Sequence, residues 1–139
     1  MEHEWAELLP AHLQQRIEEW EETLWEEADE AAGDGDEPLS YGGDLCVAPG
    51  WKAGGFAAWG VTGPRRLGCP CGSPMELLLT VASAEWGGGP GSRTPLEDRA
   101  RTGTHGRNVP TRVRVGRGGH LDVLVCSADR AHEPGVSLQ

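Results

Sequence analysis

The first third of the chain carries apolar side chains at helical spacing. Four of them recur at intervals of four, three and four residues: Leu13, Ile17, Trp20 and Leu24. This period places them on one face of a helix, and glutamates occupy half of the positions between them. Pro10 suits the first turn of such a helix, and Gly33 suits its end. We therefore predict an amphipathic, acidic helix between these two residues.

From residue 44 onward, short apolar runs are typical of strands. We predict strands at residues 44–48, 54–61, 75–83, 111–115 and 121–126, the last two forming a hairpin. The run at 75–83 is apolar on both faces, which indicates a central strand. The positions that we expect in the core are Leu77, Leu79, Val81, Val113, Val115, Leu121, Val123 and Val125.

These elements predict an α+β fold, in which the N-terminal amphipathic helix packs on a mainly antiparallel β-sheet domain of about four to six strands. Twenty-one glycines and ten prolines indicate long loops, and residues 86–110 in particular show no period and are expected to be mobile. We expect residues 1–37 to form an acidic helical lead and linker, and residues 38–139 to form a β-domain rich in glycine and tryptophan.

Charge is divided between these two parts. Residues 1–37 carry a net charge of −13 and residues 38–139 carry +3, within a total of −10. The acidic helix is therefore a candidate contact surface for another protein with a basic or amphipathic surface, with Glu18, Trp20 and Glu22 as contact residues.

Arginines dominate the second part, and seven of them fall in its loop and hairpin region: Arg93, Arg99, Arg101, Arg107, Arg112, Arg114 and Arg117. Such residues meet phosphates in nucleic-acid-binding proteins. The attached acidic segment would repel nucleic acid, so we expect these arginines to pair with the acidic helix or to keep the chain in solution.

The sequence contains no apolar run of the roughly 18–20 residues that a membrane-spanning helix needs. Its first residues lack the basic and apolar regions of a signal peptide. We therefore expect a cytoplasmic protein with no membrane partner, whose four cysteines are thiols or metal ligands rather than disulfides.

The sharpest candidate site combines three cysteines with a histidine: Cys69, Cys71, Cys126 and His132. A structural zinc site takes four such ligands, two of them close together on a turn. The pair here is Cys-x-Cys rather than Cys-x-x-Cys, which leaves less room for backbone N–H groups to bond the sulfurs. Free thiols, a zinc site and a redox disulfide all remain open, while Cys46 is expected to be a core thiol.

Tryptophan gives a second signal, because Trp51, Trp59 and Trp86 lie in or beside glycine-rich turns. One interpretation is that these rings fill the core of a domain that has few other large apolar side chains. The other is that they line an aromatic groove that receives a protein segment or ligand.

Several segments resemble the YwqG-like family of bacterial proteins. They are residues 48–56 (APGWKAGGF) followed by Trp59, residues 69–79 (CPCGSPMELLL), residues 83–86, residues 115–119, and the closing Cys126 and His132. The resemblance covers about two thirds of the chain and implies a sheet-rich α+β fold with a metal knuckle. The resemblance implies no reaction. It suggests an immunity- or regulator-like role only through the loose association of similar sequences with immunity and cell-wall proteins.

Catalytic motifs are absent from the sequence: it has no G-x-S-x-G, H-E-x-x-H, phosphate loop or dinucleotide fingerprint. His120 and Asp122 share a strand face, a pairing that we interpret as a solvated neighbour contact. The sequence therefore favours a non-enzymatic protein–protein interaction module with a structural zinc knuckle. The alternative is a zinc-dependent hydrolase or ligand-processing domain.

Overall fold

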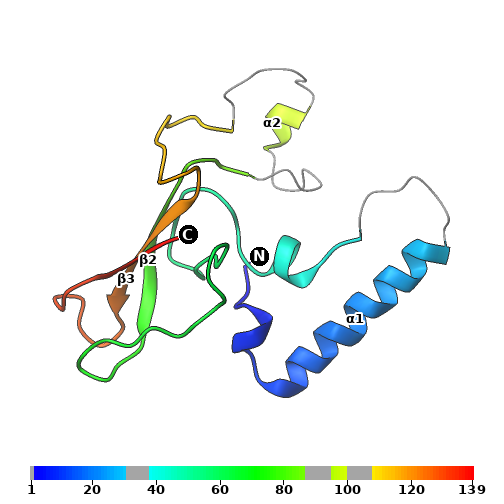
Figure 1. Cartoon of the computed structure of the whole chain (residues 1–139), viewed down its shortest axis with the longest axis horizontal. Helices are drawn as coiled ribbons and strands as arrows, with labels where there is room; N and C mark the ends of the chain where they lie inside the picture. The colour runs from blue at the N-terminus through cyan, green and yellow to red at the C-terminus, as the bar shows by residue number, and fades with distance from the viewer. Residues whose placement is uncertain (1, 31–37, 87–94, 100–107) are drawn as a thin grey trace.

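The structure, a computed structural model, describes residues 2–30, 38–86, 95–99 and 108–139 (Figure 1). Its fold class is α+β, as the sequence predicts. The helical elements are η1 (Ala6–Leu8), α1 (Ala11–Glu30), η2 (Tyr41–Leu45) and α2 (Leu96–Arg99), and the strands are β1 (Lys52–Ala53), β2 (Met75–Ala82), β3 (His120–Cys126) and β4 (Gly135–Leu138). The predicted linker before residue 38 and most of the predicted mobile loop at 86–110 lie outside the described residues.

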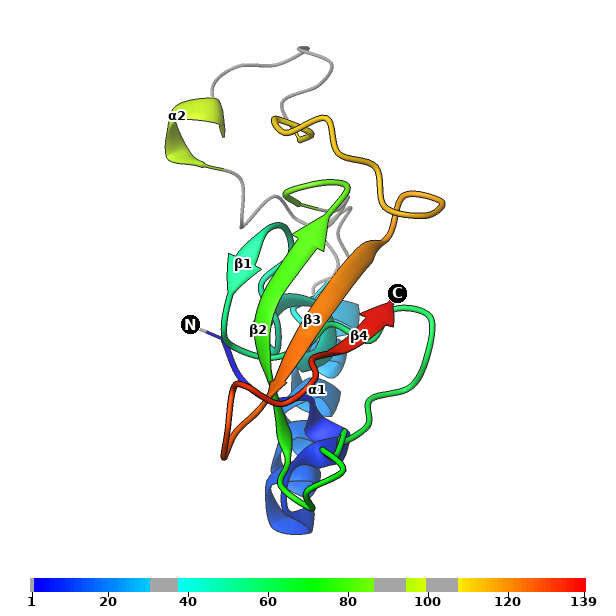
Figure 2. The same cartoon turned by 90° about the vertical axis from the view of Figure 1, so that its left-hand side faces the viewer.

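The sheet follows the chain order β1-β2-β3-β4, and each neighbouring pair is antiparallel (Figure 2). The predicted strands at 75–83 and 121–126 are confirmed as β2 and β3. The sequence pattern does not predict β4, because a run of four residues with two apolar positions is too short to show an alternating pattern.

Three predicted strands are wrong. The helical turn η2 and coil occupy residues 41–48, and residues 111–115 form no strand beyond an isolated bridge between Val115 and Gly119. In the run at 54–61, Gly54 and Gly55 adopt φ values of +71° and +77°. Positive φ lies outside the β region, so the chain turns here instead of extending.

A β-bulge in β2 decides which side chains the sheet buries. Leu77 pairs with Leu124 and Leu79 pairs with Val123, so β2 contains one extra residue between the two pairs. An extra residue reverses the inward and outward alternation beyond it. The covered face of the sheet, here called the inner face, therefore carries Leu77 before the bulge and Thr80 beyond it.

The middle row of the inner face is polar. Thr80, Asp122 and Ser137 lie in register and are 3%, 0% and 6% exposed. Thr80 Oγ1 donates a hydrogen bond to Asp122 Oδ1 at 2.6 Å, and Gln139 Nε2 donates one to Ser137 Oγ at 2.7 Å. Hydrogen bonds, each contributing about 1 kcal/mol net, thus hold part of the interior that apolar contacts would hold in an ordinary sheet.

The opposite face, here called the outer face, carries most of the apolar side chains of the sheet. They form two rows across β2, β3 and β4: Leu79, Val123 and Val136, then Val81, Leu121 and Leu138. Val136 and Leu138 are 68% and 60% exposed, and the other four are half-buried. An aliphatic grid therefore faces outward.

The predicted core is correspondingly wrong in most of its positions. Of the eight predicted residues, Leu77 and Val125 are buried, while Val113 is exposed and the remaining five are half-buried. The bulge explains the errors at Leu79 and Val81, because simple alternation continued through Leu78 assigns every later residue of β2 to the wrong face. Leu121 and Val123 lie on the outer face of β3, and Val113 and Val115 lie outside the strands.

Helix α1 packs on the β-domain through the first half of its apolar face. A small core is formed by three buried residues: Tyr41, Cys46 and Val47. Ile17 and Trp20 pack against it, and the backbone N–H of Tyr41 donates to Glu21 Oε1 at 2.6 Å. The predicted helix and the predicted burial of Cys46 are both confirmed.

The residues before α1 are also attached to the β-domain. Trp5 Nε1 donates a hydrogen bond to the carbonyl of Ala57 at 2.9 Å, and Glu2 forms an ion pair with Lys52 at 2.6 Å. The division of the chain near residue 38 stays a prediction, since residues 2–5 contact the domain that was predicted to begin after them.

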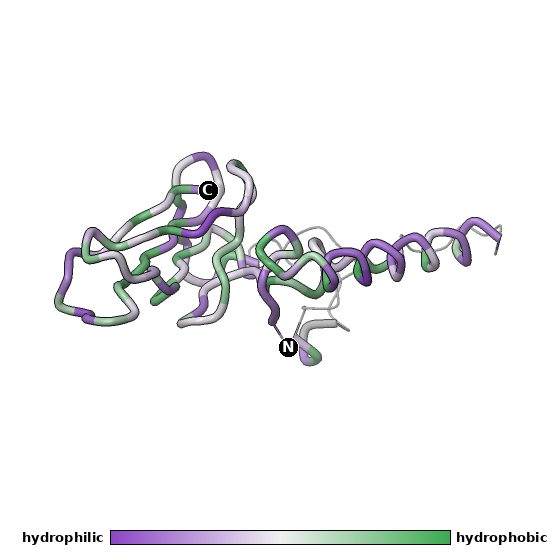
Figure 3. The backbone as a smooth tube through the Cα atoms, turned by 90° about the horizontal axis from the view of Figure 1, so that it is seen from below, coloured by the Kyte–Doolittle hydropathy of each residue, from purple (hydrophilic) through white to green (hydrophobic). Residues whose placement is uncertain are grey.

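The second half of α1 extends away from the rest of the molecule (Figure 3). Residues 22–30, here called the acidic arm, span about 14 Å at 1.5 Å per residue. The arm has five acidic side chains and no basic one, and its Trp25 is 50% exposed. No described helix, α1 included, is long and apolar enough to cross a membrane.

The two faces of the sheet predict different costs of truncation. Leu124 is 4% exposed on the inner face, so Leu124→Ala should lower the free energy of unfolding by about 2–4 kcal/mol. Val136→Ala on the outer face should cost less than about 0.5 kcal/mol. Urea unfolding measures both variants, and equal costs would contradict the assignment of the faces.

Candidate metal centre

Two of the predicted ligands lie on a tight turn immediately before β2. The backbone N–H of Cys69 donates to the carbonyl of Ser73, and that of Gly72 donates to the carbonyl of Cys69, both at 2.8 Å. Gly72 has φ +91°, a conformation that glycine adopts at little cost. The turn therefore holds Cys69 and Cys71 on one short loop.

Sheet pairing brings the third ligand to this turn. Cys126, the last residue of β3, pairs with Met75, the first residue of β2. The fourth ligand lies in the connection from β3 to β4, where the backbone N–H of His132 donates to the carbonyl of Asp129 at 3.2 Å. The connection thus folds back toward the strand end, and all four residues meet at one end of the sheet.

The four ligand atoms lie within 4.8 Å of one another. Cys71 Sγ is 3.6 Å from Cys126 Sγ, and Cys69 Sγ is 3.5 Å from His132 Nδ1. In a tetrahedral zinc site, the usual bond lengths place two sulfurs about 3.8 Å apart and a sulfur and a nitrogen about 3.6 Å apart. The cluster can therefore hold a metal ion, and its two short edges have the dimensions of a tetrahedral site.

Backbone N–H groups bond each of the three sulfurs. Cys71 supplies the N–H to Cys69 Sγ, Ser73 supplies one to Cys71 Sγ, and Asp129 supplies one to Cys126 Sγ. The Cys-x-Cys spacing predicts less room for such bonds, yet both sulfurs of the turn receive one.

These bonds set the charge of the thiols. The N–H of Ser73 is the main cause that lowers the pKa of Cys71 to about 6, and the N–H of Asp129 is the main cause that lowers the pKa of Cys126. The N–H of Cys71 also favours the thiolate of Cys69, but desolvation and the neighbouring thiols outweigh it and raise that pKa. The two thiols whose pKa is lowered, Cys71 and Cys126, are therefore the ones that favour the anionic form, and a bound cation would favour the thiolate at all three cysteines.

His132 is oriented by the sulfurs and by a carboxylate. Hydrogen bonds to Cys126 and then to Cys71 are the largest causes that raise the pKa of His132. Its Nδ1 faces Cys69, and its Nε2 lies 3.8 Å from Asp129 Oδ2. In metal sites, the ring nitrogen of histidine that does not bind the metal usually faces a hydrogen-bond acceptor, often a carboxylate. Asp129 is thus a supporting residue that spacing in the sequence did not indicate.

The cysteines are all reduced in the structure. Cys69 and Cys126 are buried, His132 is half-buried and Cys71 is exposed, so the cluster lies just below the surface. The 3.6 Å separation of Cys71 and Cys126 is far longer than the roughly 2.05 Å of a disulfide.

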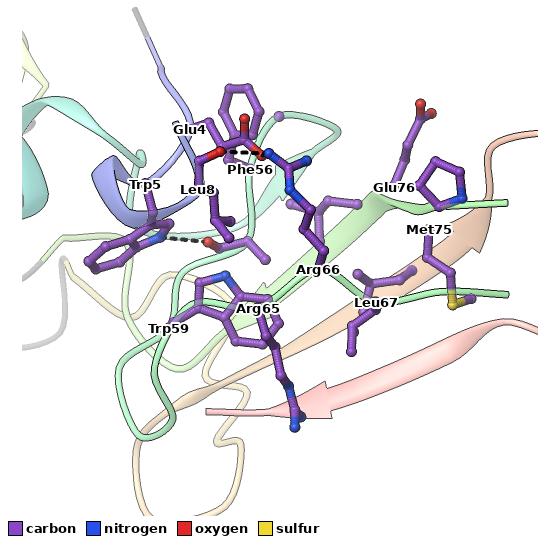
Figure 4. A pocket seen from close by; sticks show the side chains of 15 residues that line it. Glu4, Trp5, Leu8, Phe56, Trp59, Arg65, Arg66, Leu67, Met75 and Glu76 are labelled. Carbon is purple, nitrogen blue, oxygen red and sulfur yellow. Dashed lines mark hydrogen bonds and ion pairs between the residues drawn. The ribbon is translucent and has the colours of Figure 1, made fainter. Parts of the chain in front are cut away.

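The residues predicted to bind a partner do not share one site. Trp59 is buried in the wall of a pocket of about 260 Å³, where Arg65 lies 5.7 Å from its ring centroid and Arg66 points toward Glu4 (Figure 4). Trp86 lines a separate pocket of about 270 Å³. Trp51 is 39% exposed and donates its Nε1–H to the carbonyl of Ala82 at 2.8 Å.

The acidic helix α1, unlike the three tryptophans of the β-domain, forms one wall of a large groove. A groove of about 730 Å³, here called the helix groove, opens between α1 and the β-domain. Its walls are mostly apolar and comprise Leu9, Leu13, Ile17, Trp20, Tyr41, Leu45 and Phe56, with Glu2, His3, Glu4 and Arg16 at the margins. Trp20 therefore lies where the sequence predicts a contact surface. Glu18 and Glu22 are exposed on the same helix.

The pair His120 and Asp122 differs from its prediction. Asp122 is fully buried rather than solvated, and its Oδ2 has no hydrogen-bond partner among the described residues. His120 Nε2 lies 2.8 Å from the carbonyl of Ala58 and 3.6 Å from that Oδ2. An aspartate in the middle of the apolar run LDVLV was the available signal that this strand buries a polar row.

No protein-family model matches the chain, and no curated protein or solved structure matches it. The resemblance to the YwqG-like family stays a prediction. The evidence for a metal centre is the geometry of Cys69, Cys71, Cys126 and His132.

The centre predicts a metal-dependent reactivity at Cys71. This thiol is exposed and has a pKa of about 6, so in metal-free protein its thiolate predominates above pH 6. Iodoacetamide should then modify Cys71 first, with a rate that rises through pH 6 and levels off by about pH 7. Added metal should suppress the reaction, as peptide mass analysis would measure. Equal rates with and without metal would contradict metal binding at this cluster.

Proposed function

We propose that this chain is a non-enzymatic protein–protein interaction module whose β-domain is stabilised by a structural zinc ion. The supporting observation is the helix groove, which is lined mostly by apolar side chains and borders the acidic helix α1. The partner that suits it is a protein segment with a basic, amphipathic surface. An immunity- or regulator-like role is suggested by the family resemblance alone.

Zinc is the metal that the donor set favours. Thiolate and imidazole ligands in a tetrahedral arrangement are typical of zinc, whereas calcium and magnesium prefer oxygen ligands. Cys69, Cys71, Cys126 and His132 supply four ligands, which fill a tetrahedral coordination sphere. A zinc hydrolase needs a coordination position for water. The ligand count therefore supports a stabilising role over the hydrolase alternative.

The helix groove suits an amphipathic helix as its occupant. Such helices bind grooves by placing apolar residues at spacings of three and four against apolar walls. Ile17 and Trp20 form part of one wall, and Leu45 and Phe56, which are 37% and 36% exposed, belong to the lining contributed by the β-domain. Exposed acidic side chains along α1, such as Glu18 and Glu22, attract lysines and arginines of the occupant and accelerate the encounter.

A synthetic peptide tests this proposal directly. A lysine- and leucine-patterned amphipathic helix should bind, and a matched glutamate- and leucine-patterned peptide should not, because charge selects between them. The double variant Glu18→Gln, Glu22→Gln should lower the association rate about three- to tenfold at low salt, with a smaller effect at about 0.5 M salt. Stopped-flow tryptophan fluorescence measures the rate.

The matched control is the double variant Glu76→Gln, Glu133→Gln, which removes the same charge from two exposed positions of the β-domain. It should leave the rate within about twofold of the wild-type value. Binding of both peptides alike, or equal losses in the two double variants, would refute recognition through the acidic helix.

A further inference from the structure

The outer face of the sheet presents an apolar surface that is partly exposed. Six of its aliphatic side chains form the two rows described above: Val136 and Leu138 are exposed and the other four are half-buried, whereas Val125, near the end of β3, is buried. Figure 2 shows helix α1 on one side of the sheet, behind β2 and β3. Sheets of α+β proteins bury their apolar face against another layer, and exposed grids of this kind mark interaction surfaces.

One end of this grid is cationic. A Cβ atom at Gly116 would lie 3.7 Å from the side chain of Leu138, so the turn at 115–119 borders the second apolar row. Arg114 and Arg117 are exposed at this turn, and neither forms an ion pair with another described residue. Residues 108–121 contain no acidic side chain. A complementary occupant is therefore apolar on one side and negatively charged around it.

The acidic arm has this chemistry. Leu24 and Trp25 are its large apolar side chains, and its five carboxylates surround them. The arm is about 14 Å long at 1.5 Å per residue. The grid spans three strands, about 10 Å across at the usual strand spacing. The acidic arm and the apolar grid are therefore complementary: both have apolar centres, their charges are opposite, and their lengths are similar.

The arm cannot cover the outer face of its own chain. Ile17, Trp20 and Glu21 fix α1 to the small core at Tyr41. Figure 2 shows α1 behind the sheet. We propose that the outer face binds the acidic arm of a second copy of this chain. This proposal rests on the proposed function, because it names a second copy as one partner of the acidic helix.

The contact is heterologous: the arm of one copy meets the sheet of the next. Such contacts add copies head to tail until a ring closes. The average mass in solution should therefore rise with protein concentration, and the rise should weaken at high salt because ions screen the contact. Sedimentation velocity of the full chain measures this mass at about 0.05 M and about 0.5 M salt.

Substitutions on the two surfaces separate this contact from other modes of association. Val136→Glu places a carboxylate where the arm would lie and should weaken association at least tenfold. Val136→Lys should weaken it less, because a lysine can pair with the arm. Trp25→Ala should also weaken association at least tenfold. Leu96→Glu, at a position that is 73% exposed on α2, is the matched control and should leave association unchanged.

Mixing the damaged copies gives the decisive result. A Val136→Glu copy keeps its arm, and a Trp25→Ala copy keeps its sheet, so an equal mixture should form a one-to-one complex that grows no further. Two results would instead indicate sheet-to-sheet packing and overturn the proposal. One is that Trp25→Ala leaves association unchanged, and the other is that Val136→Glu and Val136→Lys weaken it equally.

A chain that stays monomeric at every concentration would also overturn it. If that monomer still binds the lysine-patterned peptide through Glu18 and Glu22, the proposed function survives and the second copy alone is excluded. If it binds neither peptide nor itself, both proposals fail.

Discussion

The arrangement of the β-domain depends on the meeting of four ligands at one end of the sheet. Cys69 and Cys71 precede β2, Cys126 ends β3, and His132 lies between β3 and β4. A metal ion bound at this point would join the turn before β2 to the end of β3 and to the β3–β4 connection, in addition to the backbone hydrogen bond from Ser127 to Pro74. Such a junction would stabilise a sheet whose inner face includes a buried polar row and whose outer aliphatic side chains are partly exposed.

The same sheet explains the division of the molecule into surfaces. Thr80, Asp122 and Ser137 occupy the covered face, so most of the apolar side chains of β2, β3 and β4 lie on the outer face. Helix α1 uses only half of its apolar face on its own domain and extends the rest away from it. Two unpartnered surfaces of complementary charge thus remain on one chain, which favours a role in association over a role in catalysis.

Local patterns in the sequence predicted the parts that depend on short-range chemistry. The period of Leu13, Ile17 and Trp20 identified α1, and the residue types of Cys126 and His132 identified the metal cluster although 55 residues separate Cys71 from Cys126. The faces of β2 could not be predicted, since one extra residue near Leu78 reverses them. The helix groove could not be predicted either, because it forms between segments that only the tertiary structure brings together.

The structural role proposed for the four-ligand cluster requires a closed zinc site. X-ray absorption spectroscopy of zinc-loaded protein measures this, because it reports the number and type of the atoms bound to the metal. We expect three sulfurs at about 2.3 Å and one nitrogen at about 2.0–2.1 Å, with no bound water. A first shell with fewer than three sulfurs, or with a water oxygen in place of a protein ligand, would contradict it.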